Sequence, residues 1–363
     1  MMRPNLRYPS AGSLAALAIA VAIVGTACSS SGGATSAGTS GSSAGGSGSS
    51  AGGSGSGALL PITYAGPTAP NGIAAQMAYG QQEGIFKKYG FDLKIVYPAN
   101  TATAAIIPDI ANGTFTISTA QPTAMMQEYE AGVKTTAIFG FLVKNPTGIT
   151  LNKKAGVSTP QQLKGKTLGV STGSANIEVT PKYLAHYGLN ESDVKVVTES
   201  LAALPGSLIS GQIDGIIAFP YAIDPQVNAK GVQTNDLLFT NAGINEMQQV
   251  FAVGNTWMQA HESMMPNLVK ALEESTEGAI KNPDEAAKDL VATAPATAPS
   301  PAVTKAQWLA SVPFMTTPNT QGHPIGYMAP EDWQETLTYA ETYLSAKPMD
   351  PALVYTDKYI SGS

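Results

Sequence analysis

The chain has 363 residues, and its low charge and its single cysteine limit the classes of protein to which it can belong. Charged residues make up 13% of the chain, the formal net charge is −6, and no run of basic residues occurs. This composition argues against nucleic acid as a partner. Cys28 is the only cysteine, which excludes disulfide bonds within the chain and argues against a thiolate metal site.

The first 28 residues have the pattern of an export signal. Arg3 and Arg7 precede an apolar stretch at residues 14–24, which is too short for a membrane-spanning helix. Residues 25–28 read GTAC and resemble the lipobox at which a bacterial lipoprotein is cleaved and acylated. We therefore expect residues 1–28 to be a lipoprotein signal peptide with a lipid anchor at Cys28. An ordinary secretory signal that ends near a chance cysteine is the alternative.

Residues 29–57 contain only Ser, Gly, Ala and Thr. Such a segment buries no apolar surface, so it is predicted to be a flexible tether. The root-mean-square reach of a coil of this length is roughly 30 Å. A tether of that reach suits a domain that docks on a partner in a membrane.

From residue 59 onward, short segments with the two-residue apolar repeat of a strand alternate with segments that have the 3.6-residue apolar repeat of a helix. Strands are predicted at residues 60–65, 91–97, 114–118, 135–141, 149–151, 167–170, 194–197, 215–219 and 250–253. Helices are predicted at residues 73–82, 102–111, 122–130, 177–187, 204–210, 266–279 and 330–343, and a loop at 292–303. This alternation predicts an α/β fold of βα units around a mainly parallel sheet.

Four sequence segments, in the order in which they occur in the chain, resemble segments of one family of solute-binding proteins. They read AYGQQEGIFKKYGFDL at residues 78–93, LKGKTLGV at 163–170, SGQIDG at 210–215, and EDW at 331–333 ahead of a tail at 350–359. The family is the periplasmic-type solute-binding proteins of the nitrate, sulfonate, taurine and thiamine-pyrimidine-precursor group, the NMT1/THI5-like and SsuA-like proteins. The resemblance covers nearly everything after residue 60.

The resemblance implies a two-lobed, type II periplasmic-binding-protein-like fold with two crossing hinge segments, near residues 141–150 and 249–255. The first lobe is expected to contain residues 59–144 and 251–363, and the second lobe residues 145–250. The resemblance also implies a function. The chain is expected to be an extracytoplasmic, lipid-anchored monomer that captures a small molecule for the permease subunits of an ABC importer, without a cofactor or a metal.

Ligands of open parallel sheets bind outside the carboxyl ends of the strands, where helix N-termini present unpaired N–H groups. The predicted strand-to-helix junctions of this chain carry mostly uncharged polar side chains and two aromatic rings. The candidate ligand-binding residues are Thr68, Asn71, Thr119, Gln121, Thr172, Ser174, Asn176, Glu199, Phe219 and Tyr221. Helix capping remains the alternative role of the Ser, Thr and Asn residues. Tyr64, Phe251 and Trp257 are expected in the core.

The distribution of arginine narrows the chemical class of the expected ligand. Arg3 and Arg7 are the only arginines, so every basic residue after the predicted signal is a lysine. The exported domain therefore lacks the planar, bidentate clamp with which arginine holds a carboxylate. We expect a neutral or heteroaromatic ligand, such as a pyrimidine or another vitamin precursor. A sulfonate held by helix N-termini is the alternative.

Two rival functions share this fold: an enzyme acting on a vitamin precursor, and a sensor that works without a transporter. His186, His261 and His323 lack metal-ligand spacing. No serine flanked as Gly-x-Ser-x-Gly has catalytic partners in reach, and the chain lacks a phosphate-binding loop motif. We therefore expect no enzyme activity. Import and sensing both need only capture and closure, so the sequence leaves that choice open.

Overall fold

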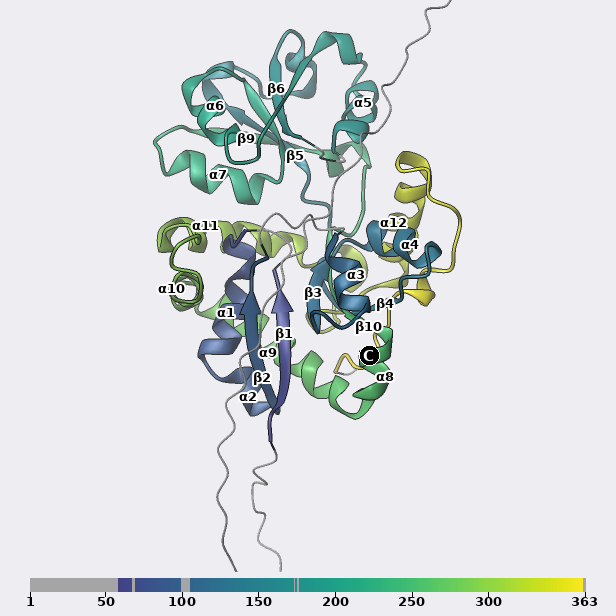
Figure 1. Ribbon diagram of the computed structural model, residues 1–363. Coiled ribbons are helices and arrows are strands. Elements are labelled where there is room, and N and C mark those ends of the chain that lie inside the picture. The colour runs from purple at the N-terminus through teal and green to yellow at the C-terminus, as the bar shows by residue number, and fades with distance from the viewer. Residues whose placement is uncertain (1–57, 67–68, 99–104, 173, 175, 362–363) are drawn as a thin grey trace, which may run out of the picture. The chain divides into compact units, whose positions relative to one another are not determined.

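The computed structural model describes residues 58–66, 69–98, 105–172, 174 and 176–361. The predicted signal peptide, the predicted tether, Cys28 and Thr68 lie outside these residues. The described part forms two five-stranded sheets (Figure 1). We call the sheet that contains the first strand, with the helices packed on it, the first lobe, and the other sheet with its helices the second lobe.

The sheet of the first lobe has the strand order β2-β1-β3-β10-β4. Its strands are β1 (Leu60–Ala65), β2 (Phe91–Val96), β3 (Ile117–Ala120), β4 (Thr135–Leu142) and β10 (Gln249–Gly254). The sheet of the second lobe has the order β7-β6-β8-β5-β9. Its strands are β5 (Gly148–Asn152), β6 (Thr167–Ser171), β7 (Lys195–Glu199), β8 (Gly215–Ala218) and β9 (Thr234–Leu238).

Both sheets are mixed: in each, four strands run in one direction and one runs against them, so the sheets are mainly parallel apart from that strand. Strands β1, β2 and β3 pair in parallel, but β10 is antiparallel to both of its neighbours. In the second lobe β5 likewise runs against β8 and β9. Each antiparallel strand is the one through which the chain enters its sheet from the other lobe. Because the chain enters at the edge where the parallel strands end, the entering strand has to run the opposite way.

Helices both precede and follow these strands. Those within the second-lobe segment are α5 (Asn176–His186), α6 (Leu204–Ser210) and α7 (Pro220–Asn228). The others are α1 (Ala75–Gln82), α2 (Ile85–Lys88), α3 (Ile106–Ala111), α4 (Pro122–Glu130), α8 (Asn255–Ala260), α9 (Met265–Lys281), α10 (Pro283–Thr293), α11 (Pro301–Ser311) and α12 (Pro330–Tyr343). Short 3-10 helices are η1 (Gly72–Ala74), η3 (Lys153–Ala155), η4 (Pro160–Leu163), η5 (Glu191–Asp193), η6 (Phe239–Ala242), η7 (Glu262–Met264), η8 (Val312–Phe314), η9 (Pro318–Thr320) and η10 (Pro351–Leu353).

The chain passes between the lobes at residues 143–147 and again at residues 239–248. The expected second crossing at residues 249–255 is wrong, because residues 249–254 form β10 and are paired and buried on both edges. The two crossings are joined by Asn145, which is 1% exposed. Its amide nitrogen donates to the carbonyl of Ile244 at 2.9 Å, and its Oδ1 accepts from the backbone N–H of Thr147 at 2.8 Å.

The predicted loop at residues 292–303 is also wrong in part. Helix α10 continues to Thr293, and α11 begins at Pro301. Pro301 occupies the first turn of α11, where proline lacks only an N–H that would have no partner within the helix. The Ser300 side chain caps this turn by accepting from the N–H of Val303. Proline and alanine here start and extend a helix instead of interrupting one.

Aromatic residues fill the core of the first lobe. The ring of Phe251 lies 6.0 Å from that of Tyr64 and 5.4 Å from that of Phe141, between ring centroids. Phe141 in turn stacks on Trp308 of α11, so α11 belongs to this core. Tyr64 and Phe251 are buried, as expected, whereas Trp257 is half-buried. In the described part of the chain no helix is both long and apolar enough to cross a membrane.

Candidate functional site

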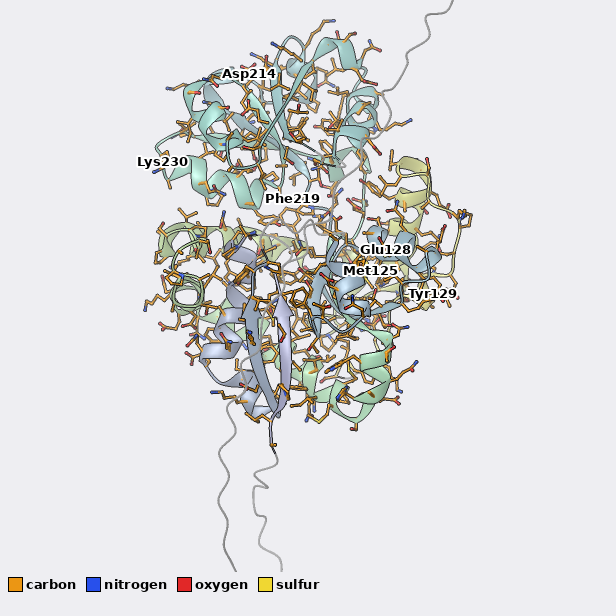
Figure 2. All side chains as sticks on the ribbon, viewed as in Figure 1. Met125, Glu128, Tyr129, Asp214, Phe219 and Lys230 are labelled. Carbon is orange, nitrogen blue, oxygen red and sulfur yellow. The ribbon has the colours of Figure 1, made fainter. Side chains whose placement is uncertain are left out.

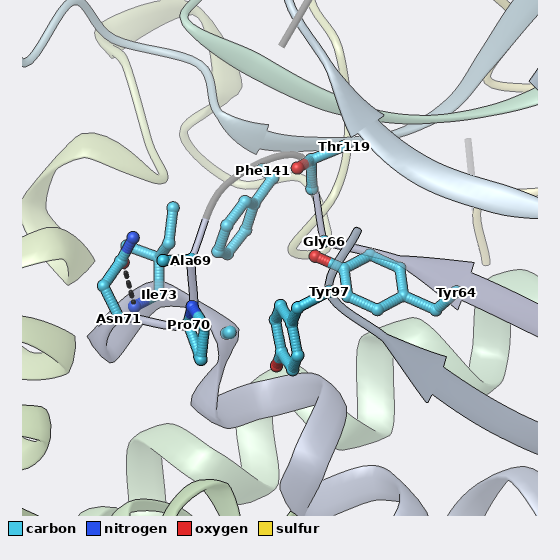
Figure 3. Close-up of a pocket in the computed structure, with 10 residues that line it drawn as sticks. Tyr64, Gly66, Ala69, Pro70, Asn71, Ile73, Tyr97, Thr119 and Phe141 are labelled. Atoms are coloured by element: carbon cyan, nitrogen blue, oxygen red, sulfur yellow. Dashed lines mark hydrogen bonds between the residues drawn. The ribbon is translucent and has the colours of Figure 1, made fainter. Parts of the chain in front are cut away.

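A pocket lies at the edge of the first sheet where β1, β2 and β3 end (Figure 3). These strands run in parallel, so their carboxyl ends bring side chains from distant parts of the sequence to one place. The cavity volume is about 10 Å³, roughly what one water needs. The residues that line it are Tyr64, Gly66, Ala69, Pro70, Asn71, Ile73, Ala74, Tyr97, Thr119 and Phe141.

The polar groups of the pocket are two phenol hydroxyls, one threonine hydroxyl and one amide. Tyr64 is buried and shares a side-chain hydrogen bond with Thr119, and burial raises its pKa to about 12. The hydroxyl of Tyr97 is buried and has no hydrogen-bond partner among the described residues. Asn71 accepts from the N–H of Ile73 at 3.2 Å, so its side chain caps η1 (Figure 3).

None of the ten lining residues carries a charged side chain. The neighbouring residues 67–68 and 99–104 read PT and ANTATA, and these are uncharged as well. A buried ionic group needs a partner of opposite charge or several hydrogen bonds to offset the loss of water. The lining therefore fits an uncharged, largely apolar molecule better than an anion.

The corresponding edge of the second lobe holds most of the other predicted residues. Thr172 follows β6, and its backbone N–H donates to the carbonyl of Glu199 at 2.9 Å. The carboxylate of Glu199 accepts from the hydroxyl of Ser207 at 2.6 Å. Ser174 Oγ accepts from the N–H of Asn176 at 3.3 Å, which stabilises the start of α5. These hydrogen bonds are local, and they engage each of the four residues in its own lobe.

Phe219 and Tyr221 stand at the start of α7, and Phe219 is labelled in Figure 2. Their rings stack on each other, with centroids 5.8 Å apart and planes inclined by 4°. Tyr221 is 4% exposed and lies against Phe314 of η8, and both aromatic residues pack on the core of the first lobe. A ligand therefore has no free face of Tyr221 to stack on in this arrangement.

The structure brings only part of the predicted set together. Asn71 and Thr119 line the pocket, while Gln121 precedes α4 without capping it by a side-chain hydrogen bond. Thr172, Ser174, Asn176, Glu199, Phe219 and Tyr221 do not line it. The sequence analysis missed Tyr64, Tyr97 and Phe141 as pocket residues. The signal that would have found them is an aromatic residue within the last two positions of a strand, or directly after it, in three strands of one sheet.

Two lobes joined by two crossings, with a pocket at the strand ends of one lobe, are the architecture of a two-lobed periplasmic-binding-protein-like α/β fold. The periplasmic aliphatic sulphonate binding protein SsuA from Escherichia coli has this fold. It superposes with a TM-score of 0.63 at 14% identity, over 85% of this chain and 95% of that one. The predicted two-lobed, periplasmic-binding-protein-like fold is thereby confirmed. Similarity at this level of identity concerns the fold alone.

The chain belongs to the NMT1/THI5-like family, whose model matches residues 72–286, more than half of the chain. A putative thiamine biosynthesis protein from Haemophilus influenzae is 24% identical over 243 residues, which are 66% of this chain and 76% of the relative. The desulfurization enzyme DSZB also shares the fold, with a TM-score of 0.56 at 15% identity, over 83% of this chain and 96% of that one. The fold thus occurs in binding proteins and in an enzyme.

Proposed function

We propose that the chain is an extracytoplasmic solute-binding protein that captures a small molecule and delivers it to the permease subunits of an ABC importer. The family, the two-lobed fold and the likeness to SsuA support this proposal. The export signal, the tether and Cys28 in the sequence support a location outside the cytoplasm with a lipid anchor. The protein acts as a monomer in this proposal, because capture needs only the two lobes of one chain.

The proposed ligand is a neutral, planar heteroaromatic molecule of the pyrimidine type. The observation that carries this proposal is the uncharged lining of the pocket, in which Tyr64, Tyr97 and Phe141 supply apolar surface. Aromatic side chains pack well against a flat ring, and hydroxyl groups fix its orientation by hydrogen bonds. The unpartnered hydroxyl of Tyr97 is available for one such bond.

A sulfonate is the alternative ligand, since SsuA is named as an aliphatic sulphonate binding protein. Peptide N–H groups at a helix start hold anions in many proteins. In this pocket a sulfonate would have to rely on such groups, because no lysine lines it. That weighs against a sulfonate here.

Capture requires the lobes to separate, because the pocket as described has room for about one water. Residues 143–147 and 239–248 connect the lobes and are the segments about which opening would occur. A ring is larger than one water, so closure over a bound ring would leave the lobes farther apart than they are in this arrangement. Binding by closure of this kind needs no chemical step, and we propose that the protein is not an enzyme.

The experiment is a ligand screen on the full chain by thermal shift, followed by calorimetry, with pyrimidines, flavins, sulfonates, nitrate and amino acids. Pyrimidine binding that weakens in Thr119→Val and persists in the matched control Tyr129→Phe is the expected result. Tyr129 lies on α4, outside the pocket lining, as labelled in Figure 2. Submicromolar binding of nitrate or of an amino acid would contradict the proposal. Mass spectrometry of the bound ligand after incubation checks that it is not turned over.

The anchor has a test of its own. If Cys28 is acylated, the wild-type protein sediments with the membranes of the producing cells and Cys28→Ser appears in the supernatant. Equal partitioning of both would contradict anchoring through Cys28. For the partner, crosslinking of ligand-loaded protein in membranes of the producing cells distinguishes import from sensing: an importer yields an adduct with an ABC permease subunit, and a sensor does not.

A further inference from the structure

Gln307 of α11 contacts both lobes through its side-chain amide. Its Oε1 accepts from the backbone N–H of Gly72 in η1 at 2.9 Å, which is a contact within the first lobe. Its Nε2 donates to the carbonyl of Ala222 in α7 at 2.7 Å, which is a contact with the second lobe. Gln307 has no exposed surface. Its hydrogen bond to Gly72 is buried, and its hydrogen bond to Ala222 is partly buried.

The close approach of η1 to α11 depends on the absence of a side chain at residue 72. A Cβ at Gly72 would lie 2.7 Å from the carbonyl oxygen of Thr304 and 2.7 Å from the nitrogen of Trp308, and would also meet the Cβ of Gln307. Real Cβ atoms essentially never come that close to the backbone. Glycine at this position therefore lets Gln307 reach the N–H.

The two partners of Gln307 are parts of the elements that carry candidate site residues. Asn71, which lines the pocket, precedes Gly72. Phe219 and Tyr221 stand just before Ala222, and both pack on the core of the first lobe. A single side chain thus ties the pocket edge of one lobe to the aromatic pair of the other. Helices α7 and α11 lie next to each other along this contact (Figure 1).

We propose that Gln307 is the positioning residue that holds the second lobe closed over the pocket of the first lobe. This inference rests on the proposed function only in that the lobes open and close. In the open state the Nε2 group exchanges the Ala222 carbonyl for water, whereas Oε1 keeps its hydrogen bond to Gly72 within the first lobe. The net contribution of such a hydrogen bond corresponds to roughly a tenfold bias of the closed over the open state.

A second glutamine provides a matched control. Gln226 of α7 also donates its Nε2 to the carbonyl of Ala222, at 2.8 Å, but both residues belong to the second lobe. Gln226→Leu removes a hydrogen bond from the same carbonyl without touching the contact between the lobes. Gln307→Leu removes the contact between the lobes and keeps a side chain of similar volume.

The test measures the separation of the lobes by energy transfer in the full chain, with no ligand present. Fluorophores are placed at Lys230→Cys in the turn that follows α7 (Figure 2) and at Lys270→Cys on α9, both exposed positions, in a Cys28→Ser background. We expect Gln307→Leu to lower the transfer efficiency, with the closed-to-open ratio falling about tenfold, and Gln226→Leu to leave it unchanged. Circular dichroism checks that each variant is folded.

Gln307→Glu supplies a readout that general destabilisation would not give. At about pH 8 its carboxylate cannot donate to the Ala222 carbonyl, so the lobes should separate, whereas at about pH 5 a protonated carboxyl donates and should restore closure. The wild type, which carries the other titrating groups, is measured at both pH values. Unchanged transfer in Gln307→Leu, equal losses in both leucine variants, or no recovery of Gln307→Glu in acid would overturn the proposal. None of these outcomes depends on which solute the protein binds.

Discussion

The buried amide of Gln307 donates to the carbonyl of Ala222 across the two lobes, at 2.7 Å. The same amide accepts from Gly72, which follows the pocket residue Asn71, so the side chain of Gln307 links α7 to the edge of the pocket. The pocket itself is lined by uncharged residues and holds little more than one water. The structure is therefore a closed arrangement with a small, neutral interior, and its consequences can be measured residue by residue.

Gly72→Ala should destabilise the fold by about 1–3 kcal/mol, because its Cβ would enter the backbone of α11. The matched control is Gly206→Ala in α6, where an added Cβ would meet nothing within 4 Å. That variant should instead stabilise by about 0.5–1 kcal/mol, as expected for alanine in place of a helical glycine. Urea unfolding gives both values. Equal effects at the two glycines would contradict the close packing of η1 on α11.

Tyr97→Phe should leave the free energy of unfolding unchanged or raise it, by up to about 1–3 kcal/mol. The reason is that its buried hydroxyl has no partner in the described structure, so its removal costs no hydrogen bond. Tyr64→Phe is the comparison, since that hydroxyl is bonded to Thr119 and its loss should be destabilising. Thermal unfolding without ligand measures both. A clear loss of stability in Tyr97→Phe would show that this hydroxyl is already satisfied.

Asn145→Ala should destabilise by about 1–3 kcal/mol, since it breaks the link between the two crossings and leaves the N–H of Thr147 and the carbonyl of Ile244 unpaired. Asn228→Ala is the control. Asn228 is exposed at the end of α7, so its replacement should change stability by less than about 0.5 kcal/mol. Denaturant unfolding measures the change in the free energy of unfolding for each of the two variants. Similar values would mean that Asn145 does not tie the crossings together.

Stability should fall as the pH rises from about 4.5 to about 8, and Glu246 in the second crossing is one cause. Burial raises its pKa to about 8 against the opposing hydrogen bond with Tyr339. Burial, together with the neighbouring carboxyl of Asp224, raises the pKa of Asp236 as well. In this window the folded state holds protons that the unfolded state has lost, so the free energy of unfolding decreases with pH.

Glu246→Gln should make that decrease shallower and should raise the melting temperature most at the alkaline end. Glu341→Gln on the exposed side of α12 is the control, and it should leave the slope unchanged. Melting temperatures measured at several pH values test this. A slope that stays the same in Glu246→Gln would show that this carboxyl does not titrate with folding.

The sequence was informative wherever periodicity and caps agree. The predicted bounds of β1, α4, α6 and α12 coincide with the observed ones, since each is a regular apolar run with a clear start. It was misleading at residues 292–303, where proline starts α11. It also misplaced the second crossing at residues 249–255, although the strand predicted at residues 250–253 is present there as β10. Both errors come from local composition, which does not report how a segment pairs with distant strands.

The site was less predictable than the fold. Asn71 and Thr119 were found because polar residues after strands are a recognised signal. Tyr64 was assigned to the core, and it is indeed buried, but it also lines the pocket. Its neighbours Tyr97 and Phe141 come from other strands, so only the pairing of the sheet brings the three rings together. The contact between Gln307 and Ala222 joins residues 85 positions apart, and no local sequence pattern predicts it.

The most direct test of the account is calorimetric titration of the full chain with a pyrimidine such as cytosine and with an alkanesulfonate such as ethanesulfonate. An uncharged pocket lined by aromatic residues predicts that the pyrimidine binds, that Tyr97→Phe or Thr119→Val weakens this binding about tenfold, and that the sulfonate does not bind measurably. Tight binding of the sulfonate with no response to pyrimidines, unaffected by either substitution, would contradict it.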